Sequence, residues 1–299
     1  MIRLGILDFD TSHVVAFASR LNHAGVAENQ WVDGAMVVAG CPGESALAPD
    51  RLAGYTAEAK KLGIPLVDKP ADLLGKVDGV IVASLDGTVH LERAKPFLEA
   101  GLPVFIDKPF ACSAAQARAI VALAARHKAP LFSSSSLRYA PEVLAARAEL
   151  GPLEGAAAWG PGSLSGDNKR NPGLFHYGIH AAEMLYALLG PGCKRVTAVS
   201  QPGATAVTGE WADGRIGTVR AIRKGASGFG FSAWGVKAAR SGAVSTDVIY
   251  RELLKRMVVF FRERKPPVDL AETVELMGFL EAANTSAANH GSVVMVDAP

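Results

Sequence analysis

Short apolar runs alternate with amphipathic segments over the first 135 or so residues. The apolar runs predict buried strands at residues 2–7, 35–41, 77–84, 103–107 and 130–135. Between them, apolar residues at helical spacing predict helices at 14–24, 49–62 and 88–100, and a helix capped by Ser113 that runs to about 127. Strands that alternate with helices form a parallel sheet with right-handed crossovers. The pattern therefore predicts a doubly wound α/β domain over 1–137, whose ligands bind beyond the carboxyl ends of the strands.

The second half of the chain has a different pattern. Strands are expected at 153–159, 195–200, 205–211, 216–222, 228–234 and 293–296, and helices at 141–150, 175–189, 246–264 and 271–289. Asp213-Gly214 is a typical hairpin turn between two of these strands. Successive strands with flanking helices predict an α+β domain over 138–299, with a mostly antiparallel, open sheet.

The overall composition narrows the class of partner. The chain has 299 residues and a formal net charge of +2, and it lacks both a basic cluster interleaved with aromatic residues and a long apolar run. These features argue against nucleic-acid and membrane partners. Cys41, Cys112 and Cys193 are odd in number and far apart, which fits a reducing compartment better than a disulfide framework. We therefore expect a cytoplasmic protein.

Four segments, in order along the chain, carry a resemblance to a known family. They are residues 77–84 with His90 shortly after, residues 98–109 ending in Asp107-Lys108-Pro109, Arg138 with Pro141, and Gly178-Ile179-His180 running on to Leu189-Gly190. Together they resemble the Gfo/Idh/MocA oxidoreductases. The resemblance implies a Rossmann-like first domain, a nicotinamide cofactor (NAD or NADP), and a sugar, polyol or related hydroxy compound as substrate.

The same resemblance assigns roles to individual residues. It implies that Lys108 and His180 lie beside the carbon that exchanges hydride. It also implies cofactor contacts from the residues around the ends of the third and fourth strands, which are Ser84, His90, Asp107 and Pro109.

The chemistry of the two proposed catalytic residues fits that role. His180 titrates near neutrality and is the natural base for a hydroxyl proton, while the Lys108 ammonium can stabilise negative charge on the substrate oxygen. His176 and Glu183 stand four residues before and three after His180, where one helical face would let either orient its ring. The family has Asp at both positions, so we predict that Glu183 takes over the orienting role. The alternative is that Lys108 is a surface residue and that the histidines form a structural cluster.

The loop after the first strand departs most from the expected pattern. A dinucleotide fold usually has G-x-G-x-x-G here, but Asp8, Asp10 and His13 occupy the three glycine positions. Two carboxylates would face the pyrophosphate at a cost of about 1–4 kcal/mol for each close pair of charges. At the end of the second strand, where an acidic residue usually binds the ribose, only Glu44 is available.

Three interpretations of this loop remain open. In the first, the carboxylates turn aside and NAD(P) binds through Thr11, Ser12 and backbone amides. In the second, dinucleotide binding is lost and the fold serves as a non-redox carbohydrate-binding protein or lyase. In the third, Asp8, Asp10 and His13 hold a divalent metal. Asp and Ser are also common turn formers and helix caps, so we assign no metal site.

The remaining expectations concern substrate and assembly. The polar loop 160–173 is expected to bind the substrate through Lys169, Arg170 and Asn171. The open sheet of the second domain is expected to provide a face for homo-oligomer formation.

Overall fold

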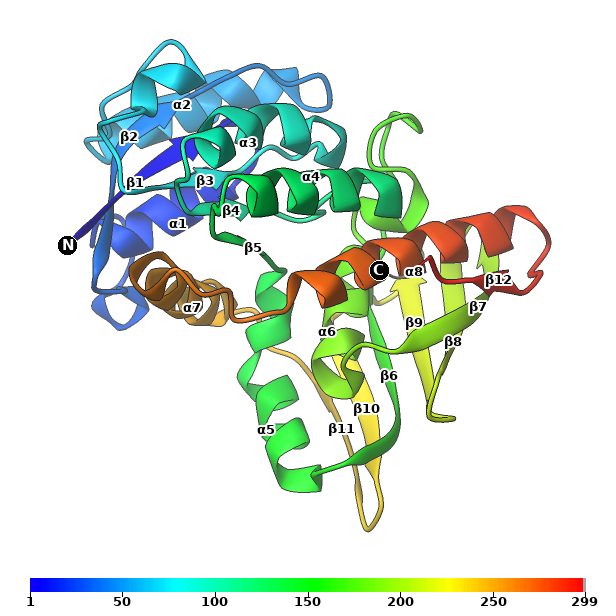
Figure 1. Ribbon diagram of the computed structural model, residues 1–299. Helices are drawn as coiled ribbons and strands as arrows, with labels where there is room; N and C mark the ends of the chain where they lie inside the picture. The colour runs from blue at the N-terminus through cyan, green and yellow to red at the C-terminus, as the bar shows by residue number, and fades with distance from the viewer. Residues whose placement is uncertain (298–299) are drawn as a thin grey trace. The chain divides into compact units, whose positions relative to one another are not determined.

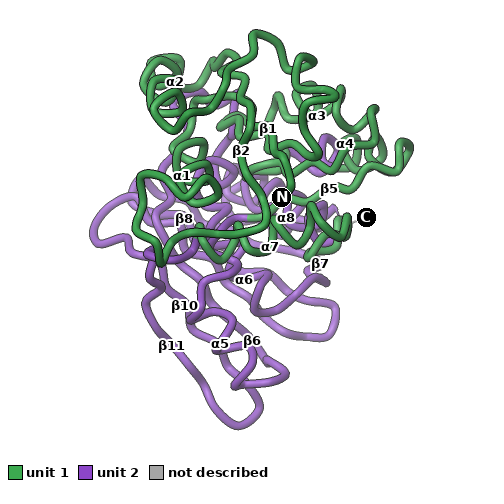
Figure 2. Tube along the Cα trace, turned by 90° about the vertical axis from the view of Figure 1, so that its left-hand side faces the viewer, with its two compact units in different colours: residues 1–111, 118–134, 250–270 green, residues 112–117, 135–249, 271–299 purple. Residues whose placement is uncertain are grey.

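The computed structural model describes residues 1–297, which form two compact units (Figure 1, Figure 2). Unit 1 comprises residues 1–111, 118–134 and 250–270. Unit 2 comprises residues 112–117, 135–249 and those from 271 onward. The sequence suggested one boundary after residue 137, whereas the main change of unit follows residue 134 and the segment 250–270 returns to unit 1. No helix within residues 1–297 is both long and apolar enough to cross a membrane.

Unit 1 contains a five-stranded parallel sheet with the strand order β2-β1-β3-β4-β5. Its strands are β1 (Ile2–Leu7), β2 (Ala35–Cys41), β3 (Gly79–Val82), β4 (Val104–Ile106) and β5 (Leu131–Ser133). Every residue of β3, β4 and β5 is buried, as expected for a parallel sheet covered on both faces. Strand order reverses between β1 and β3, so the loops after these two strands flank the expected ligand position.

The helices that cover this sheet follow the predicted positions closely. They are α1 (His13–Leu21), α2 (Leu52–Lys61), α3 (His90–Glu99), α4 (Ala114–Arg126) and α7 (Ile249–Glu263). The predicted cap of α4 is confirmed, because the Ser113 hydroxyl accepts a hydrogen bond from the Gln116 N–H at 3.1 Å.

Helix α7 belongs to unit 1 because its aromatic side chains complete the core of that unit. Phe260 packs on Phe132, with 5.5 Å between the ring centroids, and Phe132 packs in turn on Phe105 at 5.3 Å. A Cβ added at Gly79 in β3 would lie 2.5 Å from the Phe261 ring, so only glycine lets α7 approach this closely. Each buried phenylalanine contributes about 1.5–3 kcal/mol. The amphipathic pattern predicted this helix but not the unit to which it belongs.

Unit 2 contains a seven-stranded sheet with the strand order β11-β10-β6-β9-β8-β7-β12. Its strands are β6 (Leu153–Pro161), β7 (Cys193–Gln201), β8 (Ala204–Trp211), β9 (Ile216–Ile222), β10 (Gly230–Gly235), β11 (Ala239–Ala243) and β12 (Val294–Met295). The β6–β9 pair is parallel and the other neighbours are antiparallel, which confirms a mostly antiparallel sheet. Asp213-Gly214 forms the predicted turn between β8 and β9, with φ +90° at Gly214.

A helix packs on one face of this sheet, and the other face is exposed. The unit has three helices among the described residues, namely α5 (Pro141–Leu150), α6 (Ile179–Leu189) and α8 (Leu270–Ala288). Helix α6 packs on β6 and β9, as Figure 1 shows, and all its residues are buried. Side chains on the opposite face alternate outward, and Ile216 and Trp234 are about half exposed there, at 53% and 46%. The sheet is therefore open on one side, as predicted.

Unit 2 differs from the sequence pattern in three details. Strand β11 was not predicted, because Ala239–Ala243 has no alternating apolar pattern. It pairs with β10, and Arg240 and Ser241 add side-chain contacts to Glu149 and Ser232. The strands β9 and β10 are not neighbours, because β6 lies between them. The helix predicted over 175–189 begins only at Ile179, after a separate 3-10 turn over Gly173–Phe175.

Candidate active site

The loop between β1 and α1 keeps a backbone shape that suits glycine. Asp8, directly after β1, has φ +60°, in the left-handed region. Its buried carboxylate accepts a hydrogen bond from the Ser84 hydroxyl and lies 3.3 Å from Arg93 Nε. A Cβ on Gly43 would lie 2.0 Å from an Asp8 carboxylate oxygen, so glycine at position 43 leaves the room this side chain needs. The first replaced glycine therefore carries a side chain directed at the loops after β2 and β3.

Asp10, at the second glycine position, joins the same two loops. One carboxylate oxygen accepts from the Leu85 N–H at 2.9 Å, and the other accepts from the Ser45 hydroxyl at 2.7 Å. The residue is 2% exposed, and burial raises the pKa of its carboxyl. Asp10 thus ties the end of β1 to both neighbouring strands.

Burial is also the main influence on the charge of Asp8. It raises the pKa of Asp8 to about 6, although the Ser84 hydroxyl and the Arg93 guanidinium favour the charged form. A carboxyl with this pKa is only partly charged in mildly acidic solution. In mildly acidic solution, the repulsion between this position and an anion is therefore smaller than for an exposed aspartate.

The side chain of His90, at the start of α3, contacts two backbone carbonyl groups. Its Nε2 lies 2.9 Å from the Ser84 carbonyl oxygen and its Nδ1 lies 3.1 Å from the Phe110 carbonyl oxygen. The side chain is fully buried. His90 thus fixes the loop after β3, where the sequence suggested a cofactor contact.

The residue at the third glycine position, His13, pairs with Asp107, which directly precedes Lys108. His13, the first residue of α1, places Nδ1 2.5 Å from an Asp107 carboxylate oxygen, and its ring stacks on Phe17. The other oxygen of Asp107 accepts from the Lys108 N–H at 2.8 Å. Burial alone would raise the pKa of Asp107, but His13 and Lys108 outweigh it and lower that pKa. His13 and Asp107 together fix the backbone at the end of β4.

Lys108 is a buried lysine at the carboxyl edge of the sheet. It is 6% exposed and precedes Pro109 across a cis peptide bond. Burial lowers the pKa of Lys108, although the Asp107 and Asp10 carboxylates oppose the shift. A buried ammonium of lowered pKa is the form expected of a lysine that donates a proton or a hydrogen bond in a reaction. The alternative of a solvated surface lysine is wrong.

The N-terminus of α1 retains polar groups that suit an anion. The Thr11 hydroxyl accepts a weak bond from the His13 N–H at 3.4 Å, and Ser12 is exposed. Within the described chain, the Ser12 side chain makes no capping bond to α1. The positive end of this helix and the amides of its first turn are typical binding groups for phosphate.

A cleft of about 600 Å³ lies at the end of β2. Its walls are apolar at Leu66 and Val67, and Lys60 and Arg93 bring positive charge to it. Glu44, the only acidic residue the sequence offered near the end of β2, also lines the cleft. No local pattern pointed to Lys60 and Arg93 at this position, because they come from α2 and α3.

In unit 2, His180 lies at the start of α6 in contact with a serine. The Ser135 hydroxyl oxygen lies 2.7 Å from His180 Nδ1, and both residues are buried. The rings of Tyr177 and Phe229 meet the imidazole edge-on, with centroids 4.8 and 5.8 Å away. The ring of His180 is thus confined by packing and by a contact at Nδ1.

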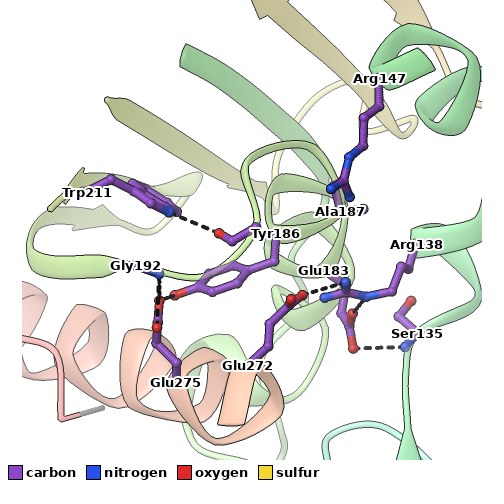
Figure 3. Close-up of polar contacts among 11 residues, drawn as sticks. Ser135, Arg138, Arg147, Glu183, Tyr186, Ala187, Gly192, Trp211, Glu272 and Glu275 are labelled. Atoms are coloured by element: carbon purple, nitrogen blue, oxygen red, sulfur yellow. Dashed lines mark hydrogen bonds and ion pairs between the residues drawn. The ribbon is translucent and has the colours of Figure 1, made fainter. Parts of the chain in front are cut away.

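Glu183 is part of a buried ion-pair chain (Figure 3). Its carboxylate accepts from the Ser135 N–H at 3.0 Å and from Arg138 Nε at 2.6 Å. Arg138 also donates to Glu272 at 2.6 Å. Burial opposes the charge on Arg138, but the two glutamates outweigh it and raise its pKa. Glu183 therefore acts on the backbone of Ser135 through this chain.

A second buried glutamate in Figure 3 has a structural role. Glu275 accepts from the backbone N–H groups of Gly192 and Cys193 at 2.7 and 2.8 Å, and from the Tyr186 hydroxyl at 3.1 Å. Burial, together with Glu275, raises the pKa of the Cys193 thiol to about 12. Cys193 is therefore a core residue and not a nucleophile.

The predicted substrate loop divides into exposed and buried residues. The backbone N–H of the exposed Lys169 donates to Asp167, and the Arg170 guanidinium lies 3.6 Å from the same carboxylate. Asn171 is fully buried and accepts from the Cys112 thiol at 3.2 Å. His176 follows the 3-10 turn, outside α6. The reasoning that put His176 on one helical face with His180 was therefore wrong.

The structure adds several residues that sequence reasoning missed. Ser135 and Glu272 in unit 2, and Ser45 and Arg93 in unit 1, contact candidate residues from distant positions in the chain. Arg138 was noticed only as part of a family motif. No local pattern marks a residue whose role is set by a partner more than 30 positions away.

The metal interpretation of the first loop finds no support in the geometry. Asp8, Asp10 and His13 point to separate partners at the ends of three different strands. Within residues 1–297, no group of three or more His, Cys, Asp or Glu side chains is arranged to hold a metal ion.

Comparison with known sequences bears on the first unit. Residues 44–135 match the Gfo/Idh/MocA family, described as an oxidoreductase family with an NAD-binding Rossmann fold. Over 117 residues the chain is 32% identical to the Salmonella typhimurium protein named "Putative oxidoreductase YceM", covering 39% of this chain and 38% of that protein. The aligned part thus spans well under half of the relative. The family resemblance predicted from the sequence is confirmed in this segment.

Comparison with solved structures covers the whole fold. GenD2 from gentamicin A biosynthesis, solved in complex with NAD, has a TM-score of 0.80 at 19% identity and matches over 99% of this chain and 97% of its own. Myo-inositol 2-dehydrogenase from Lactobacillus plantarum has a TM-score of 0.79 at 16% identity, over 99% of both chains. At these identities the likeness concerns the fold, and it confirms the predicted fold class.

Proposed function

We propose, from the match of residues 44–135 to the Gfo/Idh/MocA oxidoreductases, that this protein is an NAD(P)-dependent oxidoreductase. Its substrate would be a sugar, polyol or related hydroxy compound, the class named in the myo-inositol 2-dehydrogenase of similar fold. The observation that supports the proposal most is the buried Lys108 at the carboxyl edge of the sheet, with a lowered pKa. Burial of a lysine carries a desolvation cost, which the Asp107 and Asp10 carboxylates offset only in part, because the pKa of Lys108 stays lowered.

The residues of unit 1 fit a dinucleotide in an altered manner. Asp8 and Asp10 are engaged by Ser84, Arg93, Ser45 and the Leu85 N–H, which supports the first interpretation of the loop, in which the carboxylates turn aside. We assign the pyrophosphate to the N-terminus of α1 with Thr11 and Ser12. The cleft beside β2 has room for the adenosine half. The bound nicotinamide would accept or donate hydride.

The chain's own contribution is proton transfer and charge stabilisation. Oxidation of a hydroxyl requires a group that takes its proton, and we assign this step to His180, whose ring is contacted by Ser135 at Nδ1. Lys108 would donate a hydrogen bond to the substrate oxygen and stabilise its negative charge, a contribution worth about 3–4 kcal/mol in well-studied sites. In the reverse direction His180 returns the proton.

A non-redox carbohydrate-binding protein or lyase is the second candidate. One observation favours it, namely that all three glycine positions of the phosphate loop carry buried, bonded side chains. Such side chains prevent the close approach of a pyrophosphate to the backbone at those positions.

The location, partners and assembly that we propose are the same for both candidate functions. We propose a cytoplasmic location, a small-molecule substrate and no nucleic-acid partner, given the small net charge of +2. We also propose a homo-oligomer that forms through the open face of the unit 2 sheet, on which Ile216 and Trp234 lie exposed.

A panel of polyols and sugar acids separates the two candidates. Each compound is titrated calorimetrically, and each that binds is then incubated with NAD⁺ and NADP⁺ while nicotinamide absorbance is followed. The proposed function predicts reduction of one cofactor by at least one binding compound. If a compound binds tightly in the absence of both cofactors and neither cofactor is reduced, the result would support the non-redox candidate instead.

A further inference from the structure

Two cationic side chains line the cleft of about 600 Å³ at the end of β2. Arg93 comes from α3 and its side chain is 22% exposed, while Lys60 comes from α2 and is exposed. The proposed function assigns this cleft to the adenosine half of the dinucleotide. NADP(H) differs from NAD(H) only by a phosphate on the 2′-oxygen of that adenosine ribose. The two cations therefore lie in the part of unit 1 where the two cofactors can be distinguished.

Arg93 is anchored by the altered phosphate loop. Its Nε lies 3.3 Å from a carboxylate oxygen of Asp8, which is buried and also accepts from the Ser84 hydroxyl. A second contact of the guanidinium is long, because Nη1 lies 3.5 Å from the carboxylate of Glu92, whose side chain is 78% exposed. A guanidinium held at Nε by one carboxylate can still direct its terminal N–H groups at two oxygens of a phosphate. Arg93 is thus a preorganised anion-binding group rather than a freely moving surface cation.

The carboxylates of the cleft are less well placed than its arginine. A NAD-selective site carries an acidic residue at the end of the second strand, where the carboxylate binds the ribose hydroxyls. Here β2 ends at Cys41, and Glu44 follows three residues later as an exposed side chain. Asp68, the other carboxylate in the cleft lining, is exposed as well. The two carboxylates balance the charges of Lys60 and Arg93, so a preference between the cofactors depends on where Arg93 is held and not on net charge.

We propose that Arg93, assisted by Lys60, is the specificity-determining residue of this cleft and selects NADP(H) by binding its 2′-phosphate. The assignment rests on the proposed function, because it names which of the two cofactors that function uses. It also gives Asp8 a use in the altered loop, since the carboxylate that replaces a glycine holds the arginine at the cleft. A bidentate, charge-assisted pair between arginine and phosphate supports a preference of about 10–100-fold for the phosphorylated cofactor.

Adenosine phosphates without a nicotinamide provide the first part of the test. Wild-type protein is titrated calorimetrically with 2′,5′-ADP, 3′,5′-ADP and 5′-AMP. The 2′,5′ isomer is expected to bind about 10–100-fold more tightly than 5′-AMP, which lacks only the 2′-phosphate. The 3′,5′ isomer carries the same charge on the neighbouring carbon and is expected to bind more weakly than the 2′,5′ isomer. NADPH is expected to bind more tightly than NADH when both are followed by nicotinamide fluorescence.

Variants of the two cations provide the second part. Arg93→Gln is expected to remove most of the preference for 2′,5′-ADP over 5′-AMP, and Arg93→Lys, which keeps the charge without the planar fork, to leave part of it. Lys60→Gln keeps the Asp8–Arg93 pair and is expected to lower the preference by a smaller factor. Lys61→Gln is the matched control, because Lys61 is the next residue on α2, pairs with Glu58 and lies outside the cleft lining. If Arg93→Gln does not fold, the other two variants still decide the result.

The results separate this assignment from the proposed function. Equal or tighter binding of NADH in the wild type, or an unchanged preference in the folded variants of Arg93 and Lys60, would overturn the assignment and leave the oxidoreductase proposal intact. Equal binding of 3′,5′-ADP and 2′,5′-ADP would also overturn it, because the cleft would then recognise charge alone. Arg93-dependent binding of 2′,5′-ADP, with no binding of either dinucleotide, would keep the 2′-phosphate site and overturn the proposed function. No binding of any of these compounds would overturn both.

Discussion

The buried carboxyl of Asp8 makes a quantitative prediction about stability and pH. Burial raises its pKa from 3.8 to about 6 in the folded protein. The folded state therefore binds a proton more tightly than the unfolded chain, and this contribution to stability is complete below about pH 4 and is lost as the pH rises through 6. At about 1.4 kcal/mol per pH unit, the interval between the two pKa values corresponds to about 3 kcal/mol.

The perturbation that isolates this contribution is Asp8→Asn. The amide is neutral at every pH and still accepts from the Ser84 hydroxyl, and the pKa of about 6 already includes the attraction between Asp8 and Arg93. The free energy of unfolding of the variant minus that of the wild type should therefore rise by up to about 3 kcal/mol between pH 4 and pH 7.5.

The assay is urea denaturation at half-unit pH steps for the wild type, Asp8→Asn and Asp50→Asn. Asp50 is an exposed residue of unit 1, and its variant should differ from the wild type by a constant amount. Taking differences removes the other titrating groups, which are common to all three proteins. A difference between Asp8→Asn and wild type that stays flat or falls with pH would refute the assigned burial of this charge.

Three further predictions follow from the same contacts. Lys108→Gln should lower kcat/KM about 10²–10³-fold, since it removes a buried charge that we propose lies beside the substrate oxygen, and Lys95→Gln on the exposed side of α3 should not. Glu183→Gln should impair turnover more than His176→Asn, because it leaves Arg138 with one fewer buried anion; equal or reversed losses in steady-state kinetics would count against the ion-pair chain. Trp234→Glu should reduce the molecular mass measured by light scattering, because it places charge on the open sheet face; an unchanged mass at micromolar concentration would show that assembly does not use this face.

The strands and helices could be predicted from the sequence because their signals are local. Strands form with the predicted bounds at residues 2–7, 35–41 and 216–222. The apolar pattern that predicts each of them lies within the strand's own sequence and does not depend on its partners. Strand β11 was missed because its pairing is carried by backbone groups. The return of residues 250–270 to unit 1 depends on where Phe260 and Phe261 pack, which the amphipathic pattern of a helix does not specify.

The candidate site was predicted in part for a similar reason. The sequence identified Lys108 and His180 through their neighbours in the chain, and it located the altered loop at Asp8, Asp10 and His13. It did not identify Ser135, whose contact with His180 joins two elements 45 positions apart. It also interpreted the aspartates by their repulsion of phosphate, whereas the structure gives Asp8 and Asp10 bonding partners inside unit 1.

The central claim is that this fold still binds a nicotinamide dinucleotide despite the loss of its glycine loop. Titration of the protein with NADH and NADPH, followed by nicotinamide fluorescence, tests it most directly. We expect saturable binding of at least one cofactor below millimolar concentration, without added divalent metal. The absence of binding by either cofactor at millimolar concentration would contradict it.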